Sequence, residues 1–407
     1  MKVLFILPQI PYPPHSGGRI VTWNTVKRFS ESCRVSAVCL YHHPSELESL
    51  DEVRSVCEEA AAFPAHGKWS LTPLLKSLAS FRPYKAHRFW NPQMAGYIQQ
   101  LLQRQTFDVI HAQNFYTASY VTGREPAFKI HYKENIEGNI LLRLSQTTKN
   151  PFIRLAAWLE GRRTRRYEVR LCRRFNQILA ISPIDRDALH ALDETLPIQH
   201  QRPGVDLAAY PFLDEPEGPP SILFTGTMSY YPNAIGVQQF LRSSWPLIQK
   251  QIPGMECWIV GAHPSKTIRG YDGRHGVHVT GRAPGIDEYW RKTSIYIVPL
   301  TIGGGIRLKI LEAMASGRAI VSTSIGCEGL DVQHGKHLLT GDDPQAFAQA
   351  VITLAQDSAQ RDCIRKKARR LVEEVYDWDR VIPRQVEQYR LRFGRAREGE
   401  SASVPPC

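Results

Sequence analysis

The sequence predicts an α/β protein with two doubly wound parallel sheets. Short apolar runs alternate with helical patterns twice along the chain, and an acidic, proline-rich stretch separates the two series. The 407 residues suffice for two or three domains, and 43% apolar with 22% charged residues is typical of a globular protein. Ligands of such sheets bind beyond the carboxyl ends of the strands, so we expect an active site in the cleft between two facing domains.

The first domain is expected in residues 1–212, and 213–220 (LDEPEGPP) is predicted to be a linker. The second domain is expected in 221–377, followed by a crossover helix and tail in 378–407. The predicted strands are 3–7, 34–40, 107–111, 128–132 and 177–181 in the first domain, and 221–225, 257–260, 276–279, 294–299 and 319–323 in the second. The helical patterns of the second half are 233–250, 285–292, 307–316, 344–356, 359–375 and 378–394.

Cysteine usage and hydropathy exclude several classes of protein. The eight cysteines include no Cys-x-x-Cys pair, which argues against a zinc or redox motif and fits a reducing cytosol. No apolar run is long enough to cross a bilayer, and the opening MKVLFILPQIPYPP is interpreted as a first strand rather than a signal peptide. The expected location is therefore the cytoplasm.

The net charge of +12 is concentrated in one segment. Residues 151–175 hold eight arginines and two glutamates, with apolar residues at helical spacing. One interpretation is a solvated basic helix. The other is a patch that docks peripherally on anionic lipid at the inner face of the cytoplasmic membrane. A binding protein for nucleic acid or another polyanion would also use this patch, but the chain has no recognised nucleic-acid module.

The stretch PLTIGGGIRLKILEAMASGRAIVSTSIGCEGL places Gly303, Gly304 and Gly305 between a predicted strand and a helix. Glycines allow a ligand to approach the backbone, and the helix N-terminus offers N–H groups to a phosphate. Arg307 and Lys309 add positive charge there. The alternative is an ordinary strand–turn–helix with solvated charges. We favour a nucleotide-diphosphate site, in which Glu312 one turn later accepts hydrogen bonds from a ribose diol.

The first strand is also followed by a glycine turn, in which Gly17 and Gly18 open a helix behind Ser16, a predicted N-cap. The spacing lacks both the dinucleotide fingerprint and a phosphate loop with a Lys–Ser/Thr pair, which disfavours oxidoreductases and nucleotide triphosphatases. Two explanations of the glycines remain open. Either the backbone conformation of the turn requires them, or they allow a ligand to approach closely.

After a later strand, KIHYKENIEGN brings His131, Glu134, Asn135 and Glu137 to a strand end. The segment is either a capped turn at a helix start or, as we favour for Asn135 and Glu137, faces the cleft.

Several motifs together resemble the retaining glycosyltransferases of family four, which have the GT-B fold of two Rossmann-like domains facing across a cleft. GGGIRLKILEAMASGRAIVSTSIGCEGL resembles the family's donor-binding segment. PQIPYPPHSGGRIVTWNTVKRFS, FDVIHAQNF, ILAISPIDRDAL, RPGVDLAAYPF, ILFTGTMSYYPNAIGVQQFL, CWIVGAHP and VHVTGRAPGIDEYWRKTSIYIVPL resemble other segments in the family's order. The resemblance covers nearly the whole chain.

The resemblance implies transfer of a sugar, with retained configuration, from a nucleotide-diphosphate sugar bound by the second domain to a saccharide or lipid-linked acceptor bound by the first. No metal or cofactor is implied, and the leaving phosphate helps to deprotonate the acceptor. A role in surface polysaccharide biosynthesis is expected. The implied donor-binding residues are Gly17, Gly18, Gly226, Arg282, Gly303, Gly304, Gly305, Arg307, Lys309, Leu311 and Glu312. The implied acceptor-binding residues are Gly18, Arg19, Gln113, Asn135 and Glu137, and the catalytic candidates are His111, Arg307 and Lys309.

The chain departs from the family at three positions. Many members carry two glutamates with seven residues between them; here Glu312 matches the second and Gly304 stands at the first, which leaves the sugar's identity open. Thr227 replaces a base after the first strand of the second domain, so Arg307 and Lys309 are expected to take over its phosphate contact. His111 begins a His-Ala-Gln triplet where several members carry His-x-His. It is either a buried strand histidine or a substrate contact.

Two further alternatives follow from the sequence. A nucleotide-sugar epimerase shares this fold but needs paired carboxylates and histidines in the cleft and no acceptor. Two Asp-x-Asp triplets, Asp185–Asp187 and Asp377–Asp379, lie in helical contexts away from strand ends, and we assign neither of them a metal.

Overall fold

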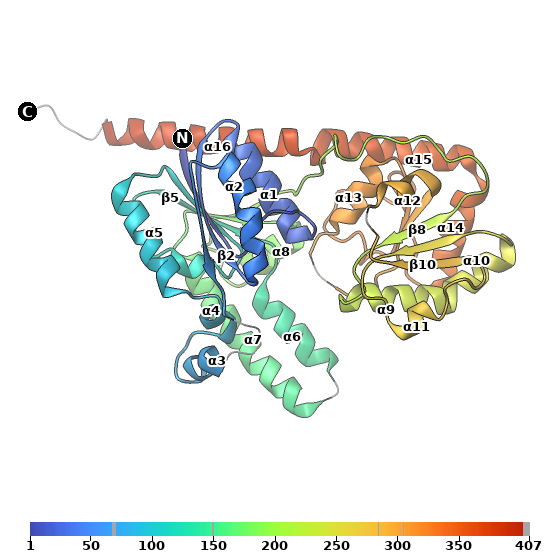
Figure 1. Cartoon of the computed structure of the whole chain (residues 1–407), viewed down its shortest axis with the longest axis horizontal. Helices are drawn as coiled ribbons and strands as arrows, with labels where there is room; N and C mark the ends of the chain where they lie inside the picture. The colour runs from blue at the N-terminus through green and yellow to red at the C-terminus, as the bar shows by residue number, and fades with distance from the viewer. Residues whose placement is uncertain (67–70, 149, 284, 304, 402–407) are drawn as a thin grey trace, which may run out of the picture. The chain divides into compact units, whose positions relative to one another are not determined.

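The computed structural model describes residues 1–66, 71–148, 150–283, 285–303 and 305–401. The chain forms two compact units, each with its own parallel sheet and core (Figure 1). The first unit comprises Met1–Arg202 with Val381–Cys407, and the second comprises Pro203–Arg380. Within the described ranges, no helix has the length and apolar character needed to cross a membrane.

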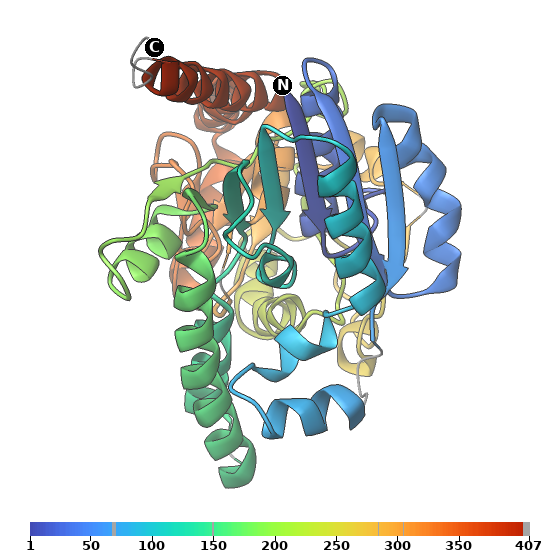
Figure 2. The same ribbon diagram turned by 90° about the vertical axis from the view of Figure 1, so that its left-hand side faces the viewer.

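The first unit contains a seven-stranded parallel sheet in the order β3-β2-β1-β4-β5-β6-β7. The central strands carry apolar residues on both faces and are almost fully buried, as expected when helices cover both sides of a sheet (Figure 2). The strands are β1 (Lys2–Leu7), β2 (Arg34–Tyr41), β3 (Glu59–Pro64), β4 (Val109–Gln113), β5 (Phe128–Lys133), β6 (Gln177–Ala180) and β7 (Ile198–His200).

The helices of the first unit connect successive strands. They are α1 (Gly17–Ser30), η1 (Pro44–Ser49), α2 (Leu50–Val56), α3 (Leu71–Leu78), α4 (Tyr84–Arg88), α5 (Pro92–Arg104), η2 (Ala118–Tyr120), α6 (Glu137–Thr147), α7 (Pro151–Cys172) and α8 (Pro183–His190). Helix α16 (Trp378–Ser401) begins in the second unit, and from Val381 onward it belongs to the first. There the Tyr389 ring lies 6.0 Å from that of Phe29, and the Arg390 guanidinium donates to the Ser32 carbonyl at 2.9 Å.

Helices α6 and α7 form an antiparallel hairpin that projects from the body of the first unit (Figures 1 and 2). Two glycines allow the helix backbones to approach closely. A Cβ on Gly138 would lie 2.8 Å from the Arg165 backbone nitrogen, and one on Gly161 would lie 3.1 Å from that of Leu142. Only the C-terminal half of α7 packs on the sheet, through residues such as Leu171.

A buried ion pair joins the base of this hairpin to the sheet. The Lys133 ammonium at the end of β5 lies 2.8 Å from Glu168 Oε1 on α7, and neither side chain has exposed surface. Glu168 also accepts the backbone N–H groups of Glu137 and Gly138 at 3.0 and 2.9 Å, so it caps the start of α6. These hydrogen bonds and the Lys133 charge compensate for the burial of the carboxylate.

The second unit contains a six-stranded parallel sheet in the order β10-β9-β8-β11-β12-β13. The strands are β8 (Ile222–Thr225), β9 (Cys257–Val260), β10 (Val277–Gly281), β11 (Ile295–Val298), β12 (Ala319–Ser322) and β13 (Leu339–Thr340). Its helices are α9 (Tyr231–Gln239), η3 (Phe240–Ser244), α10 (Trp245–Gln251), α11 (Lys266–Arg269), α12 (Asp287–Lys292), α13 (Leu308–Ala315), α14 (Pro344–Gln356), α15 (Ser358–Leu371) and η4 (Val372–Tyr376). The fold class predicted from the sequence is thus confirmed as two doubly wound parallel sheets.

The division between the units differs from the predicted one. Residues 203–220 belong to the second unit, although the sequence predicts 1–212 as the first domain and 213–220 as a linker. The reason is a set of hydrogen bonds that hold this segment on the second unit. Arg318 donates to the carbonyls of Leu213 and Asp214 at 3.0 and 2.9 Å, and Arg361 lies 3.1 Å from Glu215.

All ten predicted strands are present, within one to two residues at most ends. Three further strands, β3, β7 and β13, were not predicted, and each lies at an edge of its sheet. Strand β3 (EAAAFP) lacks the β-branched residues that signal a strand, and β7 and β13 have only three and two residues. Pairing with a neighbouring strand, rather than local propensity, therefore determines these edges.

Candidate functional site

In both units the glycine turns singled out from the sequence follow the strands at which the sheet order reverses. Strand β1 neighbours both β2 and β4, and β8 neighbours both β9 and β11. Helices after such adjacent strands lie on opposite faces, which leaves a crevice at the carboxyl edge where ligands bind. Gly17–Gly18 follows β1, whereas Gly226 follows β8 and Gly303 follows β11. Each unit therefore has a candidate ligand site at its switch point.

In the second unit, Lys309 of α13 reaches the end of β8. Its ammonium donates to the Thr225 carbonyl at 3.0 Å and to Asn233 Oδ1 at 3.1 Å, and it lies 4.6 Å from the centre of the Phe224 ring. Gly226 accommodates this arrangement, because a Cβ there would lie 2.7 Å from Asn233 Nδ2 and 3.0 Å from Lys309 Nζ. The ammonium is thereby held at the carboxyl edge of the sheet.

Arg307 precedes α13 and is 7% exposed. Its guanidinium donates to the Gly305 carbonyl. A Cβ on Gly303, whose φ is 133°, would lie 2.7 Å from Arg307 Nη2, so a side chain at 303 would displace the guanidinium. Gly303 and Gly305 therefore both lie against the Arg307 guanidinium, while Gly304 lies outside the described residues.

Glu312 lies on α13 one turn after Leu308. The Tyr210 hydroxyl donates a hydrogen bond to its carboxylate, and burial raises the pKa of Glu312 although Lys309 opposes that shift. The same burial and the nearby carboxylate raise the pKa of Tyr210. A carboxylate placed this way has acceptor capacity left for the hydroxyl groups of a ligand.

The other two residues predicted to bind a donor differ in their surroundings. Leu311 is fully buried in the core cluster of the second unit, so its side chain stabilises α13 and offers no surface to a ligand. Arg282 directly follows β10 and is exposed. It therefore lies at the carboxyl edge of the sheet as predicted, without the glycine contacts that fix Arg307.

Burial and the Arg307 charge together lower the pKa of Lys309 to about 7, against the opposing effect of Glu312. An anionic ligand beside Lys309 would favour the charged ammonium and raise this pKa. Ligand binding and protonation of Lys309 are therefore coupled.

We expect the affinity for a nucleoside diphosphate to fall as the pH rises above 7. The free protein loses the Lys309 proton near pH 7, and the neutral amine attracts phosphate far less than the ammonium does. Titration calorimetry from pH 7 to 8.5 should show roughly a tenfold loss of affinity, since each pKa unit corresponds to 1.36 kcal/mol. Lys309→Arg is the matched control, because arginine stays charged and should show a flat profile. A flat profile for the wild type would contradict the coupling.

The first unit places a polar cluster beside Gly18. A Cβ on Gly18 would lie 3.2 Å from Glu134 Oε2 and 3.5 Å from Gln9 Nε2. Asn114, which has a φ of 73°, donates to Glu134 Oε2 at 3.4 Å. Burial and the Glu137 charge together raise the pKa of Glu134 to about 7, against the opposing effect of the nearby Gln113 amide. Ends of β1, β4 and β5 therefore meet around one carboxyl group.

The remaining acceptor candidates surround this cluster. Arg19 is mostly buried, with its Nε 3.4 Å from Gln9 Oε1 and its guanidinium 3.3 Å from Glu46. Glu137 is 3% exposed, because Lys85 pairs with it at 2.6 Å and the Tyr116 hydroxyl donates to it at 3.0 Å. The carboxylates of Glu46 and Glu137 thus both have partners within the first unit.

Three predicted details of the first unit remain. Asn135 is half-buried between β5 and α6. Gly17 is the first residue of α1, and Ser16 occupies the N-cap position without a hydrogen bond from its side chain. These placements leave the N–H groups of the first turn of α1 without a side-chain cap from Ser16.

His111 lies in the core of the first sheet. It has no exposed surface, and its ring lies 4.9 Å from that of Phe5 and 6.4 Å from that of Phe29. Burial lowers its pKa to about 3, so the ring is neutral at ordinary pH. This environment agrees with the buried-strand alternative, and we do not retain His111 as a substrate contact.

Sequence reasoning did not assign several residues that complete the two clusters. In the second unit they are Thr225, Asn233 and Tyr210, and in the first unit they are Gln9, Asn114 and Glu134. The sequence places Glu134 in the strand-end segment KIHYKENIEGN, although only Asn135 and Glu137 of that segment are predicted to belong to the site. Tyr210 could not be found from the sequence, since about a hundred residues of chain separate it from Glu312.

The second unit is similar to a known sequence family. Residues 219–357 match the family described as "Glycosyl transferases group 1". The chain is 29% identical over 172 residues to an "Uncharacterized 44.6 kDa protein in cps region" of Klebsiella pneumoniae, covering 40% of this chain and 44% of that protein. It is 24% identical over 217 residues to a "Phosphatidyl-myo-inositol mannosyltransferase" of Mycobacterium tuberculosis, covering 49% and 56%. The chain thus spans about half the length of these relatives.

Comparison with solved structures extends the likeness to both units. Anabaena Alr3699/HepE, solved in complex with UDP, superposes with a TM-score of 0.67 and 14% identity, over 95% of this chain and 99% of that one. At this identity the likeness establishes the fold. The chain has the GT-B fold of two Rossmann-like units. The match to the group 1 glycosyltransferase family is confined to residues 219–357 of its second unit.

Proposed function

We propose that this protein is a retaining glycosyltransferase that moves a hexose from a nucleotide-diphosphate sugar to a saccharide or lipid-linked acceptor. The observation that carries the proposal is the cluster at the switch point of the second unit. There Lys309 and Arg307 hold two positive charges beside the glycine turns, and Glu312 follows on the same helix. Two bases, backbone N–H groups and one carboxylate suit a diphosphate joined to a ribose.

In the proposed reaction the bond between the anomeric carbon and the diphosphate oxygen breaks while the acceptor oxygen bonds to that carbon from the same face. The acceptor proton passes to the departing diphosphate. Lys309 and Arg307 stabilise the negative charge that develops on the leaving group. The donor sugar carries positive charge in an oxocarbenium-like transition state. No divalent ion is required in this scheme.

The cluster around Glu134 in the first unit is the proposed acceptor site. Its carboxyl group, that of Glu137 and the amides of Asn114 and Gln113 provide hydrogen-bonding groups that suit sugar hydroxyls. The relative encoded in a cps region supports a place in surface polysaccharide biosynthesis. The mannosyltransferase relative is named for a phosphatidyl-inositol, which supports a lipid-linked acceptor as the other option.

Thermal denaturation with a panel of UDP, GDP, ADP, TDP and CMP tests the donor site. We expect one diphosphate to raise the melting temperature by several degrees and to do so equally in EDTA, since a ligand that binds the folded state stabilises it by mass action. UDP is the first candidate, because a structure of the same fold binds it. If no nucleotide shifts the transition, the donor site is absent and a polyanion-binding protein becomes the better description.

Product analysis tests the reaction. With the identified nucleotide sugar and a saccharide acceptor, NMR should show a glycoside with the donor's anomeric configuration. Conversion of the nucleotide sugar into an epimer without any acceptor would identify an isomerase instead. Inverted configuration would refute the retaining mechanism and leave the transferase intact.

A further inference from the structure

The α6–α7 hairpin carries a concentration of exposed apolar side chains. Among the described residues, 18 large hydrophobic side chains are exposed, and seven of them lie within 20 consecutive residues of this hairpin. They are Ile140, Leu144, Phe152, Ile153, Leu155, Trp158 and Leu159. Phe152, at the tip, is 83% exposed. Contiguous exposed apolar surface of this kind marks an interaction site more often than chance exposure does.

One face of α7 changes from apolar to cationic along its length. Residues three and four apart lie on the same face of a helix. Leu155, Trp158 and Leu159 are followed at that spacing by Arg162, Arg165, Arg166, Arg170 and Arg173. We call this face, from Leu155 to Arg173, the α7 stripe. It is apolar toward the tip of the hairpin and cationic toward its base.

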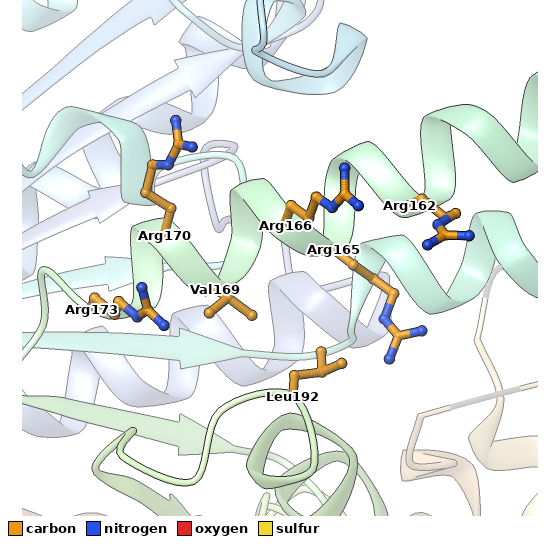
Figure 3. A pocket seen from close by; sticks show the side chains of 7 residues that line it. All are labelled: Arg162, Arg165, Arg166, Val169, Arg170, Arg173 and Leu192. Carbon is orange, nitrogen blue, oxygen red and sulfur yellow. The ribbon is translucent and has the colours of Figure 1, made fainter.

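The cationic part of the stripe forms a surface hollow of about 460 Å³ (Figure 3). The hollow is lined by Arg162, Arg165, Arg166, Val169, Arg170, Arg173 and Leu192. Arg173 pairs with Asp193 at 2.8 Å, and Arg162 lies 5.0 Å from the centre of the Trp158 ring. Within the described part of the chain, no carboxylate lies within ion-pair distance of Arg165, Arg166 or Arg170. The hollow therefore retains a large excess of positive charge.

Arg163, at the border of the α7 stripe, has a structural role instead. Its guanidinium donates to the Ser80 carbonyl at 2.7 Å and to Ser77 Oγ at 3.1 Å, and it also contacts the carbonyl of Phe81. These bonds hold the segment between α3 and α4 beside α7. Phe81 is 88% exposed there, so it extends the apolar surface of the hairpin.

We propose that the hairpin docks on the surface of an anionic lipid bilayer, with the apolar part of the α7 stripe in the headgroup–acyl boundary and the arginines among the lipid phosphates. The rise of 1.5 Å per residue places Arg166 roughly 16 Å along the helix from Leu155, so a helix that lies at an angle to the bilayer brings both ends of the stripe to a headgroup layer about 5 to 8 Å thick. Arg162, one turn from Trp158, can extend its guanidinium from the apolar zone toward the phosphates. Arginine forms bidentate hydrogen bonds with phosphate oxygens.

Both halves of the stripe are needed for this assignment. A soluble polyanion would be bound by the arginines alone and would leave the apolar tip unused. A neutral apolar partner would leave the arginines unused. A bilayer that contains anionic lipid offers both an apolar interior and phosphates within the length of one helix face. This inference goes beyond the proposed donor site, and it stands or falls independently of it.

Co-sedimentation of the full chain with vesicles tests the proposal. One set of vesicles contains phosphatidylcholine alone, and the other contains 30% phosphatidylglycerol, roughly the anionic fraction at which surface charge dominates binding. We expect at least tenfold stronger binding to the anionic vesicles and a marked loss at high salt. Equal binding to both sets, or none to either, would overturn the proposal.

Two triple variants separate the contributions of the stripe. The charge variant (Arg162→Gln, Arg166→Gln, Arg170→Gln) should bind anionic vesicles on the order of 100-fold more weakly. The apolar variant (Leu155→Gln, Trp158→Gln, Leu159→Gln) should lose at least tenfold. The matched controls are Arg54→Gln, Arg124→Gln, Arg274→Gln for charge and Ile184→Gln, Leu247→Gln, Leu391→Gln for exposed apolar area, and both should bind like the wild type.

The pattern of loss decides between the bilayer and other partners. If the charge variant loses binding and the apolar variant does not, the stripe binds polyanions and the bilayer proposal is wrong. If the control variants lose as much as the stripe variants, the attraction is a property of the whole basic surface, which also refutes it. The melting temperature and its response to the donor nucleotide should be unchanged in both stripe variants, which shows that they fold and separates this result from failure of the proposed function.

Discussion

The double variant Arg307→Ala, Lys309→Ala should lose transferase activity by a factor of at least 10³ in kcat/KM. Lys309 is fixed by Thr225 and Asn233, and Arg307 is fixed by the glycine turn, so both charges are preorganised at the carboxyl edge of the sheet. Removing a single preorganised donor to a developing negative charge typically reduces kcat by about 10² to 10³. Two losses at one leaving group are not additive, so the expected factor is set at the upper end of the range for one donor.

The measurement has two parts, steady-state kinetics and the thermal shift with the donor nucleotide. The double variant should lose the transferase activity and the nucleotide-dependent thermal shift together, because the same charges bind the ground-state diphosphate. Lys250→Ala, Arg274→Ala is the matched control, since both residues are exposed in the second unit and lie before strands β9 and β10, at the opposite edge of the sheet. If the control also loses the shift, overall charge rather than the cluster is responsible. Full activity in the double variant would refute the donor site.

The donor cluster shows how far sequence reasoning extends. Arg307 and Lys309 could be predicted because glycines and bases lie together in the chain between a strand and a helix. The partners of Lys309 could not, since Thr225 and Asn233 lie more than 70 residues away and the contact exists only once β8 and β11 pair. Local spacing identifies the residues that carry the charge. The tertiary pairing of distant segments determines which groups contact these residues, and therefore the pKa of Lys309.

His111 and Glu134 illustrate the same limit in the first unit. Both occur near the end of a strand, where a polar residue suggests function. The side chains of successive strand residues point to opposite faces, and the helices α1 and α16 that cover the face of His111 cannot be placed from its own segment. Glu134 lies just past its strand, so it reaches the polar cluster beside Gly18. A small difference in position along the strand thus separates a core histidine from a candidate site residue.

Replacing Glu168 by Gln should lower the free energy of unfolding of the first unit by about 3 to 5 kcal/mol. The substitution keeps the shape of the side chain and leaves the Lys133 ammonium buried without a counter-charge, which is the most destabilising way to break a buried ion pair. It also weakens the cap on α6, because Glu168 accepts two backbone N–H groups there. The melting temperature of the first unit should therefore fall by roughly 10 °C, by the usual relation between stability and melting temperature.

A second substitution separates charge from packing. Lys133→Met combined with Glu168→Gln removes both charges and should recover much of the loss, since no uncompensated charge remains in the core. Asp51→Asn, which breaks the exposed pair with Arg54, is the surface control and should change stability by less than about 1 kcal/mol. If Glu168→Gln proves as mild as Asp51→Asn, water must reach Lys133 and the hairpin base is not closed. The α7 stripe would then lack a rigid support on β5, because this pair is the charged link between α7 and that strand.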